Sequence, residues 1–137
     1  MNTVPNIAMV ENDRATSTAL RRLLLAQGYA VEVFHSAESY LTRTSCVPVD
    51  CLLLDVDLDG MSGLELQRRI SRPEALVPVV FMTGRHDTNV ELCAREQGCA
   101  AFLYKPFEGR LLADAIDGAL AAPHATSRIS SSRGTPC

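Results

Sequence analysis

The sequence predicts an α/β fold, a doubly wound five-stranded parallel sheet with five helices. Short apolar runs alternate with segments of helical period, and this β-α unit recurs five times. Runs such as CLLLD and VPVVFM are apolar at consecutive positions, which is typical of strands covered by helices on both faces. A chain of 137 residues that is 47% hydrophobic can bury one core of this kind.

The apolar runs give the predicted strands in chain order. They are Ile7–Val10, Ala30–Phe34, Cys51–Leu54, Val77–Met82 and Ala101–Tyr104. On the last strand we expect one of the two aromatic rings, Phe102 or Tyr104, in the core and the other at the surface.

Helical spacing of apolar residues marks the segments between and after the strands. The clearest examples are Leu20, Leu23 and Leu24 in the first helix, and Leu111, Leu112, Ala115, Ile116, Ala119 and Leu120 in the last. Gly28 fits the C-terminal cap of the first helix. The second helix, from Ser36 to about Arg43, is the weakest, because TRTSCVPVD brings β-branched residues and a proline.

The domain is expected to occupy residues 1–121. Residues 122–137 are small, polar and without period, which predicts a disordered tail or a linker stub. The net charge of −3 offers no basic footprint, so we expect no direct binding of nucleic acid. No apolar run approaches the roughly 20 residues that cross a bilayer, and no signal segment opens the chain, so we expect no membrane association and a cytoplasmic location.

Three acids at alternate positions, Asp55, Asp57 and Asp59, follow the third predicted strand in LLLDVDLDGMSG. The letters DVDLDG match the opening of an EF-hand calcium loop. The match then fails, because Leu66 stands at the twelfth position, where such a loop needs a bidentate Glu. Calcium binding of this type is therefore disfavoured.

A phosphohydrolase of the haloacid-dehalogenase type also places two acids, as Asp55 and Asp57 are, directly after an apolar strand. In that motif Thr or Val usually follows, whereas this chain has Asp59. Few residues remain to build the cap that such enzymes carry. This alternative is weaker than a phospho-acceptor site.

A phospho-acceptor site explains more of the sequence. The loops after the first, third, fourth and fifth strands open at the same edge of a parallel sheet, and they carry Glu11 and Asn12, Asp55, Thr83 and Lys105. Asp55 would attack a phosphorylated donor, while Thr83 and Lys105 would hold the phosphoryl oxygens. A divalent cation would offset the charge of the acids. Lys105 is the single lysine among thirteen basic residues.

The motifs VENDR, LLLDVDLDGMSGLEL, VVFMTGR and AFLYKPF occur in this order within residues 5–121. Together they resemble the receiver domain of two-component response regulators, in its FixJ-like branch. The resemblance implies a flavodoxin-like sheet of order 2-1-3-4-5 that takes a phosphoryl group from a sensor histidine kinase onto Asp55. It implies a phospho-acceptor rather than an enzyme, with a switching surface from about Asp87 to Leu120 that forms a phosphorylation-dependent homodimer.

The resemblance also assigns individual roles. The implied magnesium ligands are Glu11, Asn12, Asp55 and the backbone carbonyl of Asp57. Thr83 and Phe102 fall on the switch residues, the Lys105-Pro106 bond is expected to be cis, and the kinase would dock along residues 15–23. Arg85 and His86, in the loop after Thr83, are expected to tune access to the site.

One departure from the family pattern is plain. Asn12 stands where a metal-binding Asp is usual, and an amide oxygen brings no charge, so we expect weakened magnesium binding. Asp13 is expected to cap the first helix instead, and Asp59 is expected to be a solvated loop acid. The proline that is usual before the MSG turn is also missing, and Asp59 and Gly60 stand there. Asn12 also keeps open a different function, a pseudo-receiver that binds proteins without being phosphorylated.

Overall fold

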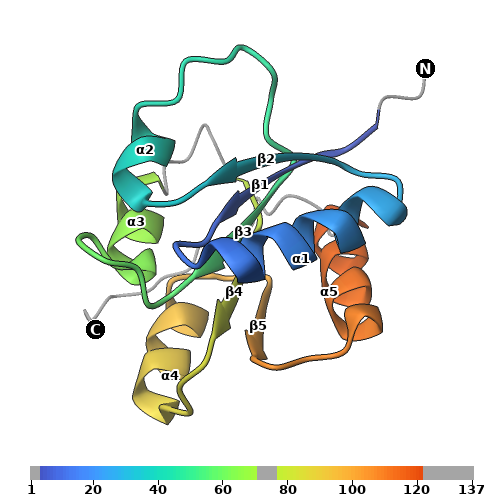
Figure 1. Cartoon of the computed structure of the whole chain (residues 1–137). Helices are drawn as coiled ribbons and strands as arrows, with labels where there is room; N and C mark the ends of the chain where they lie inside the picture. Colours follow the sequence, from blue (N-terminus) through green and yellow to red (C-terminus); the bar gives the residue numbers. More distant parts are fainter. Residues whose placement is uncertain (1–3, 71–76, 122–137) are drawn as a thin grey trace.

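The computed structural model describes residues 4–70 and 77–121, and within them five parallel strands form one sheet in the order β2-β1-β3-β4-β5 (Figure 1). The strands are β1 (Asn6–Val10), β2 (Ala30–Phe34), β3 (Cys51–Asp55), β4 (Val79–Thr83) and β5 (Ala101–Tyr104). The helices are α1 (Arg14–Ala26), α2 (Ala37–Leu41), α3 (Gly63–Ile70), α4 (Thr88–Glu96) and α5 (Gly109–Ala121). The expected fold class and strand order are confirmed. The predicted tail, residues 122–137, lies outside the described residues.

Helices α1 and α5 cover one face of the sheet. Leu24 of α1 and Ile116 of α5 are fully buried there against Ile7, Met9 and Leu53 of the central strands. Burying an aliphatic side chain of this size contributes about 1.5 to 3 kcal/mol. The alternate strand residues point the other way, so the sheet needs cover on both faces, as the consecutive apolar runs predicted.

Helices α2, α3 and α4 cover the opposite face. Each of these helices contributes a buried residue that packs in one cluster with Leu54 and Phe81 of the sheet: Ala37 from α2, Leu66 from α3 and Ala94 from α4. The second predicted helix is the shortest of the described helices and ends at Leu41 rather than near Arg43. Helix α2 buries only Ala37, and this small share of the core agrees with the weak helical pattern of its sequence.

Most local expectations hold. Asp13 caps α1, since its side chain accepts hydrogen bonds from the backbone N–H of Thr16 at 2.9 Å and from the Thr16 hydroxyl at 2.6 Å. Gly28 has φ +97°, the left-handed conformation that ends this helix. The Lys105-Pro106 bond is cis, as expected.

The expectation that Phe102 and Tyr104 occupy opposite environments is wrong. Residues two apart on a strand share a face, and both rings belong to the cluster on the α2-α3-α4 side, with centroids 5.3 Å apart. Phe102 is buried, and Tyr104, nearer the strand end, is half-buried.

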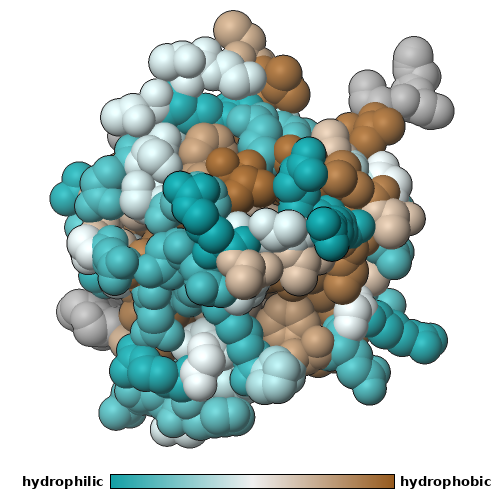
Figure 2. Space-filling view, viewed as in Figure 1, coloured by the Kyte–Doolittle hydropathy of each residue, from teal (hydrophilic) through white to brown (hydrophobic). Residues whose placement is uncertain are grey.

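The surface in Figure 2 is largely hydrophilic on the left and below, with apolar residues showing more on the α5 side. Exposed large apolar residues are Val4, Leu25, Leu41, Val47, Leu92 and Leu111. Among the described residues no helix is both long enough and apolar enough to span a membrane.

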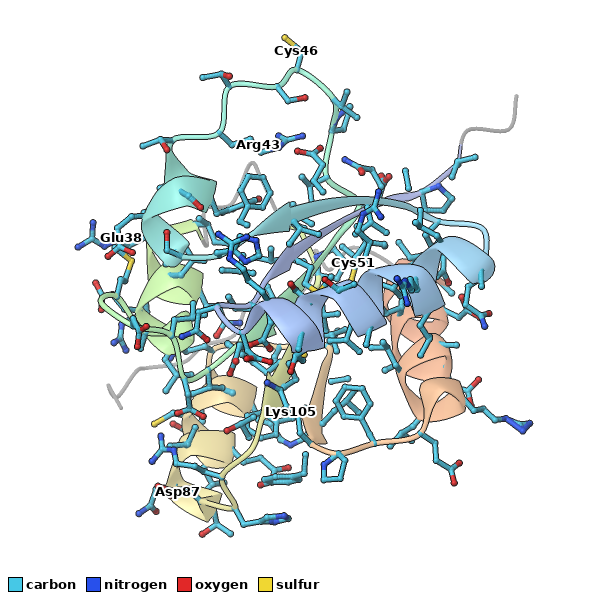
Figure 3. All side chains as sticks on the ribbon, viewed as in Figure 1. Glu38, Arg43, Cys46, Cys51, Asp87 and Lys105 are labelled. Atoms are coloured by element: carbon cyan, nitrogen blue, oxygen red, sulfur yellow. The ribbon has the colours of Figure 1, made fainter. Side chains whose placement is uncertain are left out.

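The register of the strands brings their carboxyl ends to one edge of the sheet. Val10 pairs with Leu54, Asp55 with Met82, and Thr83 with Tyr104. The polar residues that follow β1, β3, β4 and β5 are therefore collected at this edge, where Figure 3 labels Lys105, the residue after β5.

Candidate functional site

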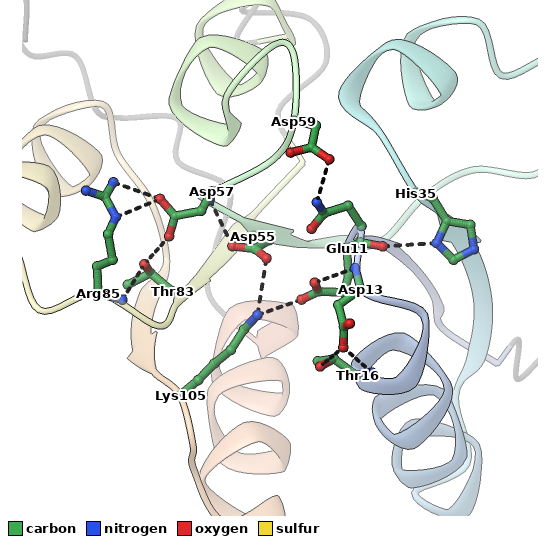
Figure 4. Close-up of polar contacts among 11 residues, drawn as sticks. Glu11, Asp13, Thr16, His35, Asp55, Asp57, Asp59, Thr83, Arg85 and Lys105 are labelled. Carbon is green, nitrogen blue, oxygen red and sulfur yellow. Dashed lines mark hydrogen bonds and ion pairs between the residues drawn. The ribbon is translucent and has the colours of Figure 1, made fainter.

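One ammonium group joins two carboxylates at this edge of the sheet. Lys105 Nζ lies 2.7 Å from Glu11 Oε1 and 3.1 Å from Asp55 Oδ2 (Figure 4). Glu11 follows β1, Asp55 ends β3 and Lys105 follows β5, so three separate strands build this contact. Glu11 is 1% exposed and Asp55 is 3% exposed, so neither acid has water as its main partner.

The electrostatics of Asp55 are set mainly by burial. Removal from water and the charge of Glu11 raise its pKa from 3.8 to about 6, although Lys105 and a backbone hydrogen bond from Asp57 act against the rise. Burial alone would lower the pKa of Lys105, but the hydrogen bond to Glu11 and the charge of Asp55 outweigh it, and that pKa is raised. The single positive charge of Lys105 therefore only partly offsets the negative charges of the two buried acids, Glu11 and Asp55.

Asp57 connects Asp55 to Thr83. Its backbone N–H donates to Asp55 Oδ1 at 2.9 Å, and its side-chain Oδ2 accepts the Thr83 hydroxyl at 2.6 Å. Arg85 holds the same carboxylate with two nitrogens, at 2.9 and 2.7 Å from Oδ1. Partial burial would raise the pKa of Asp57, but the bonds from Arg85 and Thr83 outweigh it and lower that pKa.

The Thr83 hydroxyl is thus already engaged. It donates to Asp57, and its oxygen accepts the backbone N–H of Arg85 at 3.1 Å. A hydroxyl has one proton to donate, so an additional acceptor at Asp55 would have to compete with the Asp57 carboxylate. Sequence reasoning placed Arg85 near the site but did not predict its bond to Asp57.

Asn12 and Asp59 contact each other at the rim of the site. Asn12 Nδ2 donates to Asp59 Oδ2 at 3.1 Å. The loop that carries Asp59 is also held from α2, since the backbone N–H of Met61 donates to Glu38 Oε2 at 3.1 Å. Gly60, which lies between Asp59 and Met61, has φ +76°, and a Cβ there would lie 3.0 Å from the Glu38 carboxylate. Asp59 is exposed, as expected, but it has a defined partner.

Two supporting contacts gave no signal in the sequence. The Nδ1 atom of His35 lies 3.0 Å from the backbone carbonyl of Glu11, and its Nε2 lies 3.3 Å from Arg14 Nη1. Arg14 can only donate, so Nδ1 carries the ring proton and donates it to the carbonyl. His35 follows β2 and so steadies the backbone of the acidic loop, a role that no motif around it indicates.

Gly63, the first residue of α3, lies directly against the backbone of Asp55. A Cβ at position 63 would lie 2.3 Å from the Asp55 carbonyl oxygen and 3.0 Å from Val56 Cα. The Gly63 N–H donates to the Val56 carbonyl at 3.0 Å. Helix α3 therefore begins in direct backbone contact with the end of β3.

Phe102 lies apart from the polar cluster. The centroid of its ring lies 6.0 Å from that of Phe81, and the residue is 7% exposed. Tyr104 donates its hydroxyl to Glu91 Oε1 at 2.6 Å, and the ring of His86 stacks on it at 4.2 Å. These contacts connect the loop after β4 with α4 and β5.

The donor set suits magnesium in kind. Hard divalent cations take carboxylate, amide and carbonyl oxygens, and Glu11, Asn12, Asp55 and the Asp57 carbonyl offer these. Across residues 4–70 and 77–121 no group of three or more His, Cys, Asp or Glu side chains is arranged to hold a metal. Within this set only Glu11 and Asp55 supply buried carboxylates.

Topology and site together define a CheY-like α/β domain. The chain belongs to the response regulator receiver domain family, whose model matches residues 7–117. It is therefore a receiver domain of two-component signalling and not a classical enzyme.

Relatives support this assignment. The chain is 36% identical over 110 residues to nodulation protein W and 32% identical over 120 residues to the transcriptional regulatory protein FixJ, both of Bradyrhizobium diazoefficiens. These alignments cover 80% and 88% of this chain but 48% and 58% of the relatives. The chain thus spans about half the length of the curated relatives it matches.

Solved structures agree with the fold. The FixJ-N structure superposes with a TM-score of 0.80 at 27% identity, over 93% of this chain and 100% of that one. A CheY-like receiver domain from Methanospirillum hungatei gives 0.78 at 25%, over 86% and 94%. A BeF3-activated DrrB receiver domain gives 0.76 at 27%, over 88% and 100%.

Proposed function

We propose that this domain accepts a phosphoryl group from a sensor histidine kinase onto Asp55. The observation that carries the proposal is the contact of a buried Asp55 with Lys105, itself bonded to Glu11. A pKa of about 6 leaves most of the Asp55 carboxylate ionised at neutral pH, so it can act as a nucleophile. Receiver-family membership makes a kinase the expected donor.

The transfer forms one bond and breaks another. A carboxylate oxygen of Asp55 attacks phosphorus, and the bond between phosphorus and the donor imidazole nitrogen breaks. That nitrogen keeps the electron pair of the broken bond and then takes up a proton. Lys105, now 3.1 Å from Asp55 Oδ2, is placed to pair with a phosphoryl oxygen on the product. The product adds roughly one to two negative charges to a site that already holds Glu11.

Magnesium is the proposed cofactor. Glu11, Asn12, Asp55 and the Asp57 carbonyl would hold the ion, which would supply positive charge opposite the acids and the phosphoryl oxygens. Because Asn12 is neutral, we expect this chain to bind magnesium less tightly than receivers with an acid at that position.

The switch would begin at Thr83. In the structure its hydroxyl bonds Asp57, so a phosphoryl group at Asp55 has to draw it away from that acceptor. Movement of Thr83 would let the ring of Phe102, which is already buried against Phe81, change its packing and with it the α4-β5-α5 surface, which would then support a homodimer. The BeF3-activated DrrB receiver domain, which shares the fold, makes beryllofluoride a suitable probe of this state.

The remaining assignments follow from this function. We propose residues 1–121 as the receiver domain, a kinase contact along residues 15–23, and a cytoplasmic location beside the kinase module. This chain would not contact nucleic acid itself, in line with its net charge of −3.

Incubation with acetyl phosphate or phosphoramidate and magnesium, followed by intact-mass analysis, tests the proposal. We expect the gain of one phosphoryl group in the wild type and none in Asp55→Asn. Asp50→Asn is the matched control: this acid directly precedes β3, at the other end of the strand from Asp55, and the variant should be modified like the wild type. No gain in the wild type would favour the pseudo-receiver, a binding module that works without phosphorylation.

A further inference from the structure

The structure assigns to Asp59 a role in magnesium binding: it orients the Asn12 side chain so that the amide oxygen is available to the ion. This inference rests on the proposed function, because it concerns the metal that phosphorylation would use. It adds a positioning residue that the family pattern does not contain, since a proline is usual where Asp59 stands.

An amide ligand has a chemical problem that a carboxylate lacks. The two oxygens of Asp are equivalent, so either can face a cation, whereas Asn presents an oxygen at one end and an N–H donor at the other. A cation gains only from the oxygen end. An Asn at a metal site therefore needs something that selects one of its two flipped orientations.

Asp59 supplies that selection. Its carboxylate can only accept hydrogen bonds, so the group facing it at 3.1 Å has to be the Asn12 Nδ2 donor rather than the oxygen. Because the amide is planar, Oδ1 then faces away from Asp59. The two departures from the family pattern, Asn12 and Asp59, are thus in direct contact with each other.

Asp59 is held in a position to do this. Glu38 of α2 accepts the backbone N–H of Met61, and the Gly60 backbone passes close beside the same carboxylate. The loop that carries Asp59 is therefore held by α2 as well as by its contact with Asn12. The two acids next to Asn12 in sequence are engaged elsewhere: Glu11 accepts from Lys105, and the Asp13 carboxylate caps α1 through two bonds to Thr16.

Charge attraction by Asp59 is the competing explanation, and the two make different predictions. Asp59 is exposed, so its charge is screened by water and salt. Asp59→Asn removes the charge but keeps an oxygen that can accept from Asn12, whereas Asp59→Ala removes both. In an Asn12→Asp background the side chain at position 12 has two equivalent oxygens. Asp59 should then have no effect on magnesium affinity.

Magnesium affinity measured by calorimetry on the full chain tests the inference, with urea midpoints confirming that every variant is folded. We expect Asp59→Ala to weaken binding about two- to tenfold, the range that corresponds to one hydrogen bond. Asp59→Asn should stay within about twofold of the wild type. In Asn12→Asp, adding Asp59→Ala should change the affinity less than about twofold.

Three results would overturn the role of Asp59 while leaving the proposed function intact: an unchanged affinity in Asp59→Ala, an equal loss in Asp59→Asn, or the same loss in the Asn12→Asp background. Absence of any magnesium binding by the wild type would overturn this inference together with the magnesium assignment. The phosphoryl mass gain described above reports on Asp55 separately, so the two failures are distinguishable.

Discussion

Replacing Asp55, the proposed phospho-acceptor, is expected to stabilise the fold. In Asp55→Asn the buried charge disappears, and with it the repulsion between Asp55 and Glu11. The pKa of Asp55, raised by burial and by Glu11 from 3.8 to about 6, shows that the folded protein disfavours the ionised form. At about 1.4 kcal/mol per pKa unit this corresponds to about 3 kcal/mol at neutral pH.

The net gain should be smaller than this value. Asparagine has one acceptor oxygen, so it cannot keep both the bond from Lys105 at 3.1 Å and the bond from the Asp57 N–H at 2.9 Å. Losing one of them costs about 1 kcal/mol. The expected increase in the free energy of unfolding is therefore about 2 kcal/mol at pH 7.5.

The pH dependence gives the prediction its sign. Since the folded pKa of Asp55 lies above its ordinary value, the folded state binds the proton more tightly, and the wild type loses stability as pH rises from about 4 to about 6. The advantage of Asp55→Asn should be present at pH 7.5 and absent near pH 4. Magnesium should reduce the stability difference between Asp55→Asn and the wild type at pH 7.5, because it stabilises the wild type.

Urea unfolding followed by far-ultraviolet circular dichroism is the assay, in buffer with EDTA, because the chain has no Trp to report by fluorescence. Asp114→Asn, an exposed acid of α5, is the control and should change stability by less than about 0.5 kcal/mol. A variant no more stable than the wild type at pH 7.5, or a gain that persists undiminished at pH 4, would refute the reasoning.

Three further predictions concern other contacts. Asp57→Ala should bind beryllofluoride about two- to tenfold more tightly than the wild type, because the Thr83 hydroxyl no longer has a competing acceptor; weaker binding in a calorimetric titration would contradict this. Asn12→Asp should raise magnesium affinity by about tenfold or more, since it adds a charged ligand, and equal affinities would contradict it. Arg43→Ala should lower the free energy of unfolding by about 1 to 2 kcal/mol at neutral pH, because Arg43 holds Glu32 through hydrogen bonds of 2.8 and 2.7 Å. Arg43 lowers the pKa of Glu32, so this loss should shrink as pH falls below about 4, and an unchanged loss in acid urea titrations would argue against the pair.

The fold was predictable because burial on both faces of a sheet leaves a strong pattern. Consecutive apolar residues in β1, β3 and β4 are fully buried, so their strands could be recognised without any structural information. Boundaries were less certain. The run Val77–Met82 became a strand from Val79 to Thr83, because hydrophobicity marks burial and not the hydrogen-bond ladder that defines a strand.

The site was predictable as a set of residues but not as a set of contacts. Parallel strands bring Glu11, Asp55 and Lys105 to one edge, and the ladder alone implies this. The bond of Thr83 to Asp57 and the clasp by Arg85 depend on side-chain rotamers, which leave no periodic trace in a sequence. The same holds for the contact between Asn12 and Asp59.

The start of α3 sets the spacing behind Asp55, the proposed nucleophile. Gly63 leaves no room for even a methyl group against the Asp55 carbonyl, so substitution there has to push the helix and the strand end apart. Such a variant would change the position of Asp55 relative to Lys105 without replacing any acidic, hydroxyl or ammonium side chain of the site. If Asp55 accepts a phosphoryl group as proposed, bulk at position 63 would change the rate of transfer through the backbone behind this carboxylate, and a substitution scan restricted to the polar side chains of the site would miss it.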